Sequence, residues 1–474
     1  SSRLYVDGKY LLTHYHQHSV QHVYAAGYDK EKHELILKAV NVADTPYTVH
    51  YILENAETEG EGHAITLSSA NLTDENSFDT PDLIQPTEST FHVDEGVVDY
   101  TLAPHSLTIL RIKARPTLTA TACGAIGDGK TICTQAIQHG IDSLAAMGGG
   151  RLRLTSGTYL TGLIKMESNV ELWLDKDATL LGSTDPRDYE KTLSTSKRGD
   201  EDVHLGLIVA EGARNISLRG KGTIDGQGLA LALAIDSLHH IGERPDPYYN
   251  YRRMRPSSRP KLFFLNNSDG ILIEGLTLRN SAGWGLSIDR SKNIEISHVT
   301  VYNRAYWNND GIDLNDCTNA EVHHCNIDAA DDGICLKSDD HELGCEDIWI
   351  HDNRITSSAS AVKMGTASYG GFRRVRIQNI FVYDTFRSAV ALETVDGGLM
   401  EDIEVDGIEA VNTGNPIFVC LGGRHLRPMP DNTAAGHDKE NVNRHNVARN
   451  ITIRNVKAQV PFGRPDEAYD LRGP

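Results

Sequence analysis

The sequence lacks any run of about 18 apolar residues, so it contains no candidate membrane-spanning helix. Its seven cysteines are too few in 474 residues for a disulfide scaffold, and none has the Cys-x-x-Cys or Cys/His spacing of a zinc site. We therefore expect mostly buried free thiols. Basic residues are also scarce: 46 Lys and Arg stand against 65 Asp and Glu, and the net charge of -19 argues against a nucleic-acid partner.

The first part of the chain has the pattern of an antiparallel β-sandwich. Between about residues 20 and 113, short alternating stretches are separated by polar turns. These stretches are 35–37, 47–53, 64–67 and 107–112. A change of composition at 114–117 indicates a linker. We predict a β-sandwich accessory domain over 1–115 and a second, catalytic domain over 116–474.

The second domain has the periodicity of a solenoid. It contains one predicted helix, 134–147, which ends at the glycine run 148–150. Beyond this helix the sequence is strand-like, and an apolar-x-apolar triplet recurs, mostly every 23 to 28 residues. The triplets begin at Ile271, Ile294, Ala320, Ile348, Val375, Ile403 and Ile451. This period predicts a parallel β-helix whose N-terminal end is capped by the helix.

Acidic residues gather in two neighbouring coils of this predicted solenoid. Asp310 and Asp331 are about one coil apart, so stacking is expected to place one above the other. A turn or bulge at 330–333 would let both Asp331 and Asp332 reach one cleft, since a regular strand points neighbouring side chains to opposite faces. Crowded carboxylates repel one another, so one of them is expected to hold its proton to higher pH, as a general acid must.

Two other interpretations of these acids stay open at this point. Asp side chains frequently accept hydrogen bonds from turn amides, a role that we expect for Asp313, Asp316 and Asp328. An oxygen-rich cluster also suits a calcium ion.

Several ordered motifs accompany the acids over about residues 118–474. They are Gly124–Lys130, Gly148–Gly150, Ser156–Tyr159, Gly220–Gly228, Arg259-Pro260, Trp284, Asn308–Gly311 and Asp331-Asp332. The set resembles the polygalacturonase-type enzymes of glycoside hydrolase family 28. The resemblance implies a right-handed parallel β-helix and an inverting, metal-independent mechanism without a cofactor. It further implies that Asp331 is the general acid and that Asp310 and Asp332 position the water, with roughly 6.5–9.5 Å between acid and base carboxyls.

The sequence departs from the family at two motifs. Residues 358–366 lack the His of the usual Gly-His-Gly, and Glu393 lies where an Arg-x-Lys usually binds the galacturonate carboxylate. An acidic residue there would repel that carboxylate. Either Lys363, Arg387 and Arg424 rebuild a cationic site from other positions, or the reacting sugar is neutral and Glu393 binds its hydroxyl groups.

Two residues beside Asp310 complete the expected substrate site. We expect Trp307 to stack on a sugar ring and Asn308 to contact the substrate. In the first hundred residues, the segments 26–29, 37–41 and 102–108 resemble the C-terminal β-sandwich of family 51 α-L-arabinofuranosidases. That resemblance implies an accessory module without chemistry of its own.

These observations predict an all-β protein, a right-handed single-stranded parallel β-helix with an N-terminal antiparallel β-sandwich. We expect an inverting glycoside hydrolase that cleaves pectin-type cell-wall polysaccharide or its oligosaccharides. The insertions 229–258 and 422–446 favour exo-action because they would close one end of a cleft. A calcium-dependent polysaccharide lyase or epimerase and a non-catalytic carbohydrate-binding β-helix are the alternatives. A polymeric substrate implies secretion or a periplasmic location.

Overall fold

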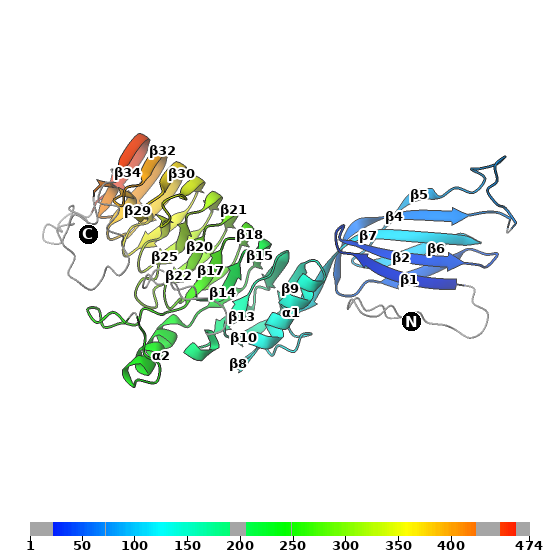
Figure 1. Ribbon diagram of the computed structural model, residues 1–474, viewed down its shortest axis with the longest axis horizontal. Helices are drawn as coiled ribbons and strands as arrows, with labels where there is room; N and C mark the ends of the chain where they lie inside the picture. The colour runs from blue at the N-terminus through cyan, green and yellow to red at the C-terminus, as the bar shows by residue number, and fades with distance from the viewer. Residues whose placement is uncertain (1–21, 72, 190–204, 248, 423–445, 461–474) are drawn as a thin grey trace. The chain divides into compact units, whose positions relative to one another are not determined.

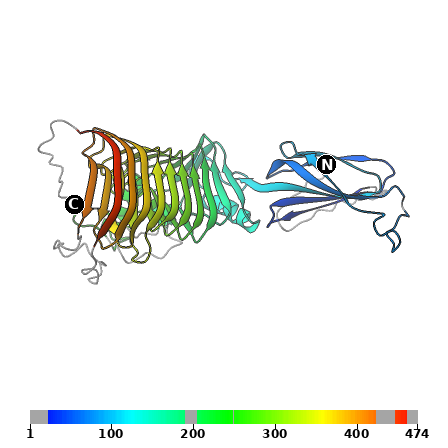
Figure 2. The same ribbon diagram turned by 90° about the horizontal axis from the view of Figure 1, so that it is seen from above.

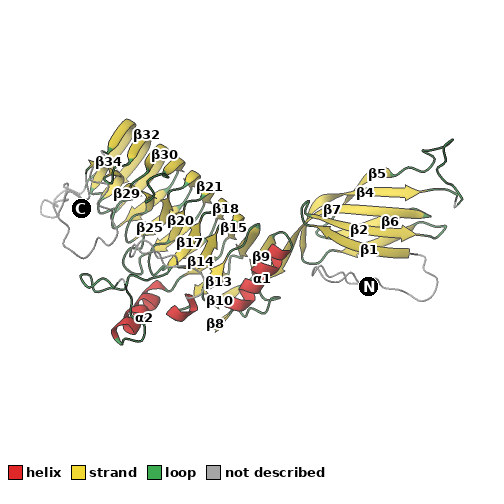
Figure 3. Cartoon of the chain, in the orientation of Figure 1, coloured by secondary structure: helices red, strands yellow, loops and turns green. Residues whose placement is uncertain are grey.

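The computed structural model describes residues 22–71, 73–189, 205–247, 249–422 and 446–460. These residues form two compact units, one containing residues 1–118 and 142–152 and the other residues 119–141 and 153–474. Each unit is built almost entirely of strands (Figures 1 and 3). Arg424 lies outside the described residues.

The N-terminal unit is the predicted antiparallel β-sandwich. One sheet has the order β1-β2-β7-β4-β5, and β3 pairs with β6 in the other. The strands are β1 (His22–Asp29), β2 (Glu34–Asn41), β3 (Tyr47–Ile52), β4 (Ala56–Ser68), β5 (Thr87–His92), β6 (Val97–Leu102) and β7 (Ser106–Thr119). Alternate residues of β2 and β7 fill the core, among them Leu35, Leu37, Leu110 and Ile112.

The segment 114–117, predicted as a linker, is part of β7. Ala114 continues the buried alternation of Leu110 and Ile112, and Pro116 lies opposite Ala56 of β4. Strand pairing therefore extends through the change of composition. The domain boundary at residue 115 stays a prediction.

The second unit is a right-handed parallel β-helix whose coils stack in regular columns of strands (Figure 2). Its first strands are β8 (Asp128–Ile132), β10 (Gly157–Thr161), β12 (Val170–Leu174) and β13 (Ala178–Gly182), and β9 (Gly150–Leu154) contains the division between the two units, after residue 152. The column that carries the predicted triplets continues with β15 (Arg214–Gly220), β18 (Asp269–Glu274), β21 (Lys292–Ser297), β24 (Thr318–His323), β27 (Cys345–His351), β30 (Gly371–Tyr383), β32 (Leu399–Val411) and β34 (Val447–Gln459). All seven triplets face one another in register, which confirms the predicted repeat.

Two further columns complete the coils. One contains β16 (Thr223–Asp225), β19 (Thr277–Arg279), β22 (Thr300–Asn303), β25 (Asn326–Ala329) and β28 (Arg354–Ser357). The other is a sheet of nine strands in the described chain: β11 (Ile164–Lys165), β14 (Gly206–Glu211), β17 (Lys261–Asn266), β20 (Leu286–Asp289), β23 (Ile312–Asn315), β26 (Ile334–Ser338), β29 (Val362–Ser368), β31 (Ser388–Thr394) and β33 (Asn415–Leu421). This nine-stranded sheet positions the candidate site.

Helices are few, as predicted. The helix α1 (Thr134–Ala146) confirms the predicted segment, and its Gln138 exchanges hydrogen bonds with the backbone of Lys165 in β11 at the first coil. A short 3-10 helix, η1 (Pro186–Tyr189), and α2 (Gly228–His240) are the others in the described residues. The seven cysteines are free and five of them are buried, as expected. No described helix is long and apolar enough to span a membrane.

Candidate active site

Asp310 and Asp332 occupy equivalent places on successive coils. Each lies two residues before a strand of the nine-stranded sheet, and the register pairs Ile312 of β23 with Ile334 of β26. The amide of Gly311 donates to the carbonyl of Asp332 at 2.9 Å. A Cβ atom at Gly311 would lie 2.4 Å from the carbonyl oxygen of Gly333, so a glycine is needed for this close stacking.

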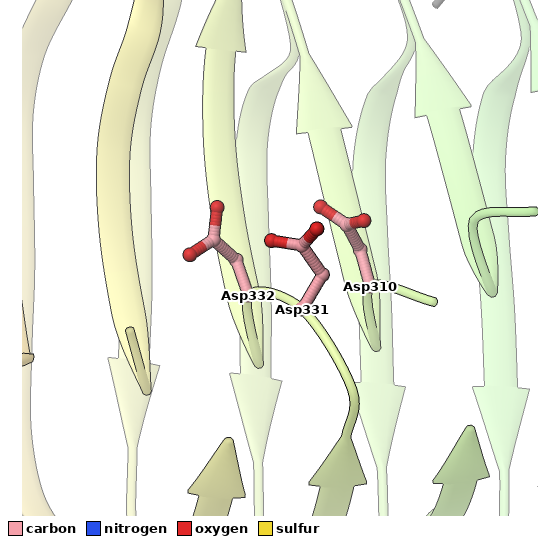
Figure 4. A group of neighbouring side chains, drawn as sticks. All are labelled: Asp310, Asp331 and Asp332. Atoms are coloured by element: carbon pink, nitrogen blue, oxygen red, sulfur yellow. The ribbon is translucent and has the colours of Figure 1, made fainter. Parts of the chain in front are cut away.

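Asp331 lies between the other two acids because the chain bends at residues 330–333 (Figure 4). The Ala330 amide donates to the carbonyl of Asn309 at 3.1 Å, and the Ser357 hydroxyl donates to the Asp331 carbonyl. The predicted bend therefore brings both neighbouring acids to one place. The predicted stacking of Asp331 on Asp310 is wrong, since the strand register stacks Asp332 on Asp310 and Asp331 is inserted between them.

The three carboxylates are closer than the sequence analysis expects. One oxygen of each lies within 4.8 Å of an oxygen of the others, whereas the carboxyl groups of an inverting pair are usually roughly 6.5–9.5 Å apart. The reason is the position of Asp331. Its side chain lies between those of Asp310 and Asp332, so its carboxyl group is less than a full coil spacing from either. Ionising all three carboxyl groups at this distance would carry a large electrostatic free-energy cost.

Two lysines on the outer face of the sheet divide the charge among the acids. Lys363 Nζ of β29 lies 3.1 Å from Asp332 Oδ2. Lys337 Nζ of β26 lies 2.9 Å from Asp313 Oδ1 and 3.6 Å from Asp310 Oδ2. Within the described residues, Asp331 has no ion pair, so it differs from both neighbours.

The pKa values follow this arrangement. Burial raises the pKa of Asp331, and the charge of Asp332 adds to the rise. Burial also acts on Asp332, but Lys363 and Lys337 outweigh it and lower its pKa. Burial, with the charge of Asp313, raises the pKa of Asp310 well above its usual range. The two lysines therefore favour the charged form of Asp332, whereas burial favours the neutral forms of Asp331 and Asp310.

The three acids expected to serve turns have different roles. Asp316 does accept hydrogen bonds from the amides of Asp339 and Asp340, at 3.2 and 3.0 Å. Asp328 instead forms an ion pair with Arg304. Asp313 is fully buried and binds Lys337, so its expected turn role is wrong, because strand alternation turns it outward beside the three clustered acids.

A cleft of about 530 Å³ opens beside Asp331. The loops that precede the strands line it, and they contribute Arg253, Trp307, Asn308 and Arg387. Trp307 is 52% exposed, and the Arg253 guanidinium lies 5.9 Å from its ring centroid. The expected exposed aromatic platform is therefore beside the acid.

The Trp307 loop is held by the buried side chain of Arg259. Its guanidinium donates to the carbonyls of Ala282 and Trp307, at 2.6 and 2.5 Å, and to Asn308 Oδ1 at 3.2 Å. Arg255 donates to the same Asn308 oxygen. The Asn308 side-chain oxygen thus orders the loop, although the residue also lines the cleft.

Replacing Arg259 with Met is expected to loosen this loop. Each carbonyl left unpaired in a buried place costs about 1–3 kcal/mol, so the free energy of unfolding should fall by roughly that amount or more. KM should rise more than kcat falls, because the substitution loosens the Trp307 loop, which is expected to bind the sugar, and leaves the three acids unchanged. Urea unfolding and steady-state kinetics measure both, with the exposed Arg252→Met as control. An unchanged KM would contradict the assigned support.

Comparisons with known proteins agree with this geometry. Residues 151–384 match the sequence model of Glycosyl hydrolases family 28. The family 28 match contains Asp310, Asp331 and Asp332. Residues 5–106 match the Alpha-L-arabinofuranosidase C-terminal domain, which agrees with the resemblance seen in the first hundred residues.

Individual relatives extend the family 28 match. A probable polygalacturonase of Vitis vinifera is 31% identical over 304 residues, which are 60% of this chain and 59% of the relative. The exo-poly-alpha-D-galacturonosidase of Dickeya chrysanthemi is 25% identical over 55% of this chain and 49% of its own length. The chain thus spans about half to three fifths of the length of these two curated relatives.

Solved structures share the family 28 fold. An exopolygalacturonase from Thermotoga maritima has a TM-score of 0.57 and 24% identity, and covers 72% of this chain and 80% of its own. The family 28 exopolygalacturonase of Yersinia enterocolitica has a TM-score of 0.58 and 18% identity over 91% of this chain and 83% of its own.

The two departures from the family 28 motifs lie close together. Lys363 is a buried strand residue bound to Asp332, so it is not a free cation for the substrate. Glu393 of β31 is 6% exposed, and Thr366 donates to its Oε2 at 3.3 Å. Burial raises the pKa of Glu393, although the charge of Lys363 opposes the rise.

Sequence reasoning missed Lys337 and Arg253. Lys337 has a recognisable signal, because Ile334 and Leu336 are apolar core residues, and strand alternation then turns Cys335 and Lys337 outward beside the acids. Arg253 has no such signal. It reaches Trp307 only because of the way the 229–258 insertion folds. Within that insertion, Asp246 Oδ2 accepts hydrogen bonds from the amides of Ser257 and Ser258.

Proposed function

We propose that this protein is an inverting glycoside hydrolase that acts on pectin-type polysaccharide or its oligosaccharides. The observation that carries the proposal is the unequal charge of three converging carboxylates. Asp331 lacks an ion pair among the described residues and its pKa is raised by burial, whereas Lys363 lowers the pKa of Asp332. A glycosidase needs one carboxyl group of each kind.

In the proposed reaction, the Asp331 carboxyl gives its proton to the glycosidic oxygen as the bond to the anomeric carbon breaks. The Asp332 carboxylate accepts a proton from the water that attacks that carbon. Asp310, within 4.8 Å of both, fixes the same water by a hydrogen bond. Arg253 and Trp307 hold the sugar that lies in the cleft.

Exo-action is supported by the insertion 229–258. Its Arg253 lies over Trp307 and its Arg255 binds Asn308, so the insertion lines the cleft beside the acids. Several relatives bear exo-acting names, including the exo-poly-alpha-D-galacturonosidase. A wall at one end of a cleft favours cleavage near a chain terminus. A polymeric substrate also favours action outside the cytoplasm.

The anomer of the first product tests the stereochemistry. We expect the product of an α-linked pectic oligosaccharide to appear first as the β-anomer in proton NMR, before mutarotation. The short separation of the acids makes this measurement decisive, because carboxyl groups about 5–5.5 Å apart usually retain configuration. An α-anomer at early times would replace the inverting mechanism by a retaining one.

The lyase or epimerase alternative requires a neutral basic group or a calcium ion beside the acids. Lysines are present, but Asp332 and Glu393 raise the pKa of Lys363 despite its burial, which makes it a poor base. Chelator-sensitive release of unsaturated products would support this alternative. Absence of product from every pectic substrate would favour the carbohydrate-binding alternative.

We propose that the β-sandwich is an accessory module without catalytic chemistry. Its matched family is the C-terminal domain of another glycosidase, and the three converging carboxylates all belong to the β-helix. Binding of arabinan or pectin side chains by the sandwich would contradict a purely structural role.

A further inference from the structure

The last turn of α2 is attached to the loop that follows it by the side chain of His239. The Nδ1 atom of this residue accepts a hydrogen bond from the backbone amide of Asp246 at 2.9 Å. Its Nε2 atom lies 3.3 Å from the hydroxyl of Tyr251. The ring also stacks on Tyr249, with 4.1 Å between the centroids and 2° between the planes. The loop therefore contacts both ring nitrogens and one face of His239.

Asp246 connects this end of the helix to the far end of the loop. Its side chain is buried, and its carboxylate accepts the amides of Ser257 and Ser258 at 2.6 and 2.9 Å and the Ser258 hydroxyl at 2.7 Å. The chain between these two attachment points carries Arg253, whose guanidinium lies over Trp307. The attachment at the helix end is thus connected to the aromatic platform of the cleft.

The hydrogen bond at Nδ1 requires a neutral imidazole. A backbone amide can donate only to a ring nitrogen that carries no hydrogen, so the hydrogen of His239 is on Nε2, from which it is donated to the Tyr251 hydroxyl. An imidazolium ring carries hydrogens on both nitrogens, and the second would point at the Asp246 amide. Imidazoles ordinarily gain a proton at about pH 6.5, so a proton and this hydrogen bond compete in mildly acidic solution.

The groups around the ring do not favour its charged form through an ion pair. The titratable and charged residues there are Asp236, His240, Glu243, Arg244, Tyr249 and Tyr251, besides Asp246. Asp236 accepts the Tyr249 hydroxyl at 2.8 Å and lies 3.7 Å from His240 Nε2. Glu243 lies 3.8 Å from Arg187 of η1. Among the described residues, none of the acids pairs with His239.

We propose that His239 is a positioning residue, which attaches the Arg253 loop at the cleft while its ring is neutral and releases the loop when the ring gains a proton. The inference rests on the proposed function, because this loop belongs to the proposed sugar site. It adds a control of substrate affinity by pH that does not involve the three carboxylates. Affinity is lost in mildly acidic solution, and the protons that take part in the reaction are not affected.

Hydrogen exchange of the loop, followed by mass spectrometry, tests the attachment without any substrate. The amides of Asp246, Ser257 and Ser258 should be protected at about pH 8, where imidazoles are neutral. Loss of one buried hydrogen bond usually changes an opening equilibrium roughly five- to hundred-fold. Protection in the wild type, corrected for the intrinsic exchange rate, should fall by such a factor as pH is lowered to about 5.5. This arm needs no variant.

Two variants separate the acceptor atom from the ring. His239→Phe keeps a ring to stack on Tyr249 and has no acceptor, so its loop should be poorly protected at every pH. His239→Asn offers an amide oxygen near the position of Nδ1 and does not titrate, so its protection should not depend on pH. His240→Phe changes the neighbouring imidazole, which contacts the Tyr249 hydroxyl instead, and should keep the pH dependence of the wild type.

Steady-state kinetics then connects the loop to the cleft. The apparent affinity falls with the fraction of molecules whose loop is attached. With the pectic oligosaccharide that the wild type cleaves fastest, KM of His239→Phe at about pH 8 should rise by up to the factor lost in protection, with little change in kcat. His239→Asn should remove the part of the rise in KM of the wild type below about pH 6.5 that comes from this ring.

The outcomes distinguish this inference from the proposed function. Protection that is the same in the wild type at both pH values, or the same in His239→Phe as in the wild type, would overturn the proposal. Altered exchange in His239→Phe with unchanged KM would overturn the positioning role. The expected exchange pattern in a protein that cleaves no pectic substrate would refute the hydrolase and support the attachment of the loop by His239.

Discussion

Replacing Asp331 with Asn is expected to lower kcat/KM by about 10²–10⁴-fold, the usual contribution of a general acid. The amide keeps the size of the carboxyl group and cannot protonate the leaving oxygen. The residual activity should lose the alkaline limb of its pH profile, because that limb reports the ionisation of Asp331, whose pKa is raised by burial. Product release from pectic oligosaccharides across a range of pH measures both effects.

The leaving group provides the control for this variant. In a glycosyl fluoride of the reacting sugar, the fluoride ion leaves without being protonated, so Asp331→Asn should cleave this substrate nearly as fast as the wild type does. Asp328→Asn, which removes a nearby acid bound to Arg304, should leave hydrolysis almost unchanged. A loss of equal size for the fluoride and the natural linkage would refute the acid assignment, as would undiminished turnover.

The repeat made the fold of the β-helix predictable. The six triplets from Ile271 to Ile403 bury their first and third residues, and the same spacing continues along the solenoid, so periodicity alone placed Ile271, Ile348 and Ile403 in one column. The end of the sandwich was harder to predict. Composition changes at 114–117, but Ala114 is still a core residue of β7, and burial keeps the strand intact there.

The site was predictable where it follows from local sequence. Asp331 and Asp332 needed a bend, and residues 330–333 provide it. The order of stacking was not predictable, because a shift of one residue exchanges which acid lies above Asp310. Arg253 depends on how an insertion folds back over Trp307, which is a long-range contact with no local periodicity.

Lys363 illustrates how a structure changes the meaning of a residue. In the sequence it is a candidate for binding the substrate carboxylate. In the fold its side chain forms an ion pair with Asp332, and the cations that line the cleft are Arg253 and Arg387 on the loops. We therefore expect the lysine to set the charge of Asp332 rather than to bind the substrate.

Replacing Lys363 with Met is expected to leave Asp332 buried without its cation. Breaking such a buried pair costs roughly 3–5 kcal/mol, so the free energy of unfolding should fall by this amount at neutral pH. The pKa of Asp332, now lowered by Lys363, should rise above its usual value. Because the unfolded state then loses its proton at lower pH than the folded state, the loss of stability should grow as pH rises through the ordinary carboxyl range and shrink as pH falls.

Catalysis should respond through the same group. An Asp332 that ionises only at higher pH moves the acid limb of kcat/KM upward, and activity near neutral pH falls with it. The double variant Asp332→Asn, Lys363→Met removes both charges, so most of the stability should return while activity does not. Urea unfolding at several pH values, combined with pH–rate profiles of the single and double variants, measures this coupling. A Lys363→Met protein with an unshifted acid limb would show that Lys363 does not set the charge of Asp332.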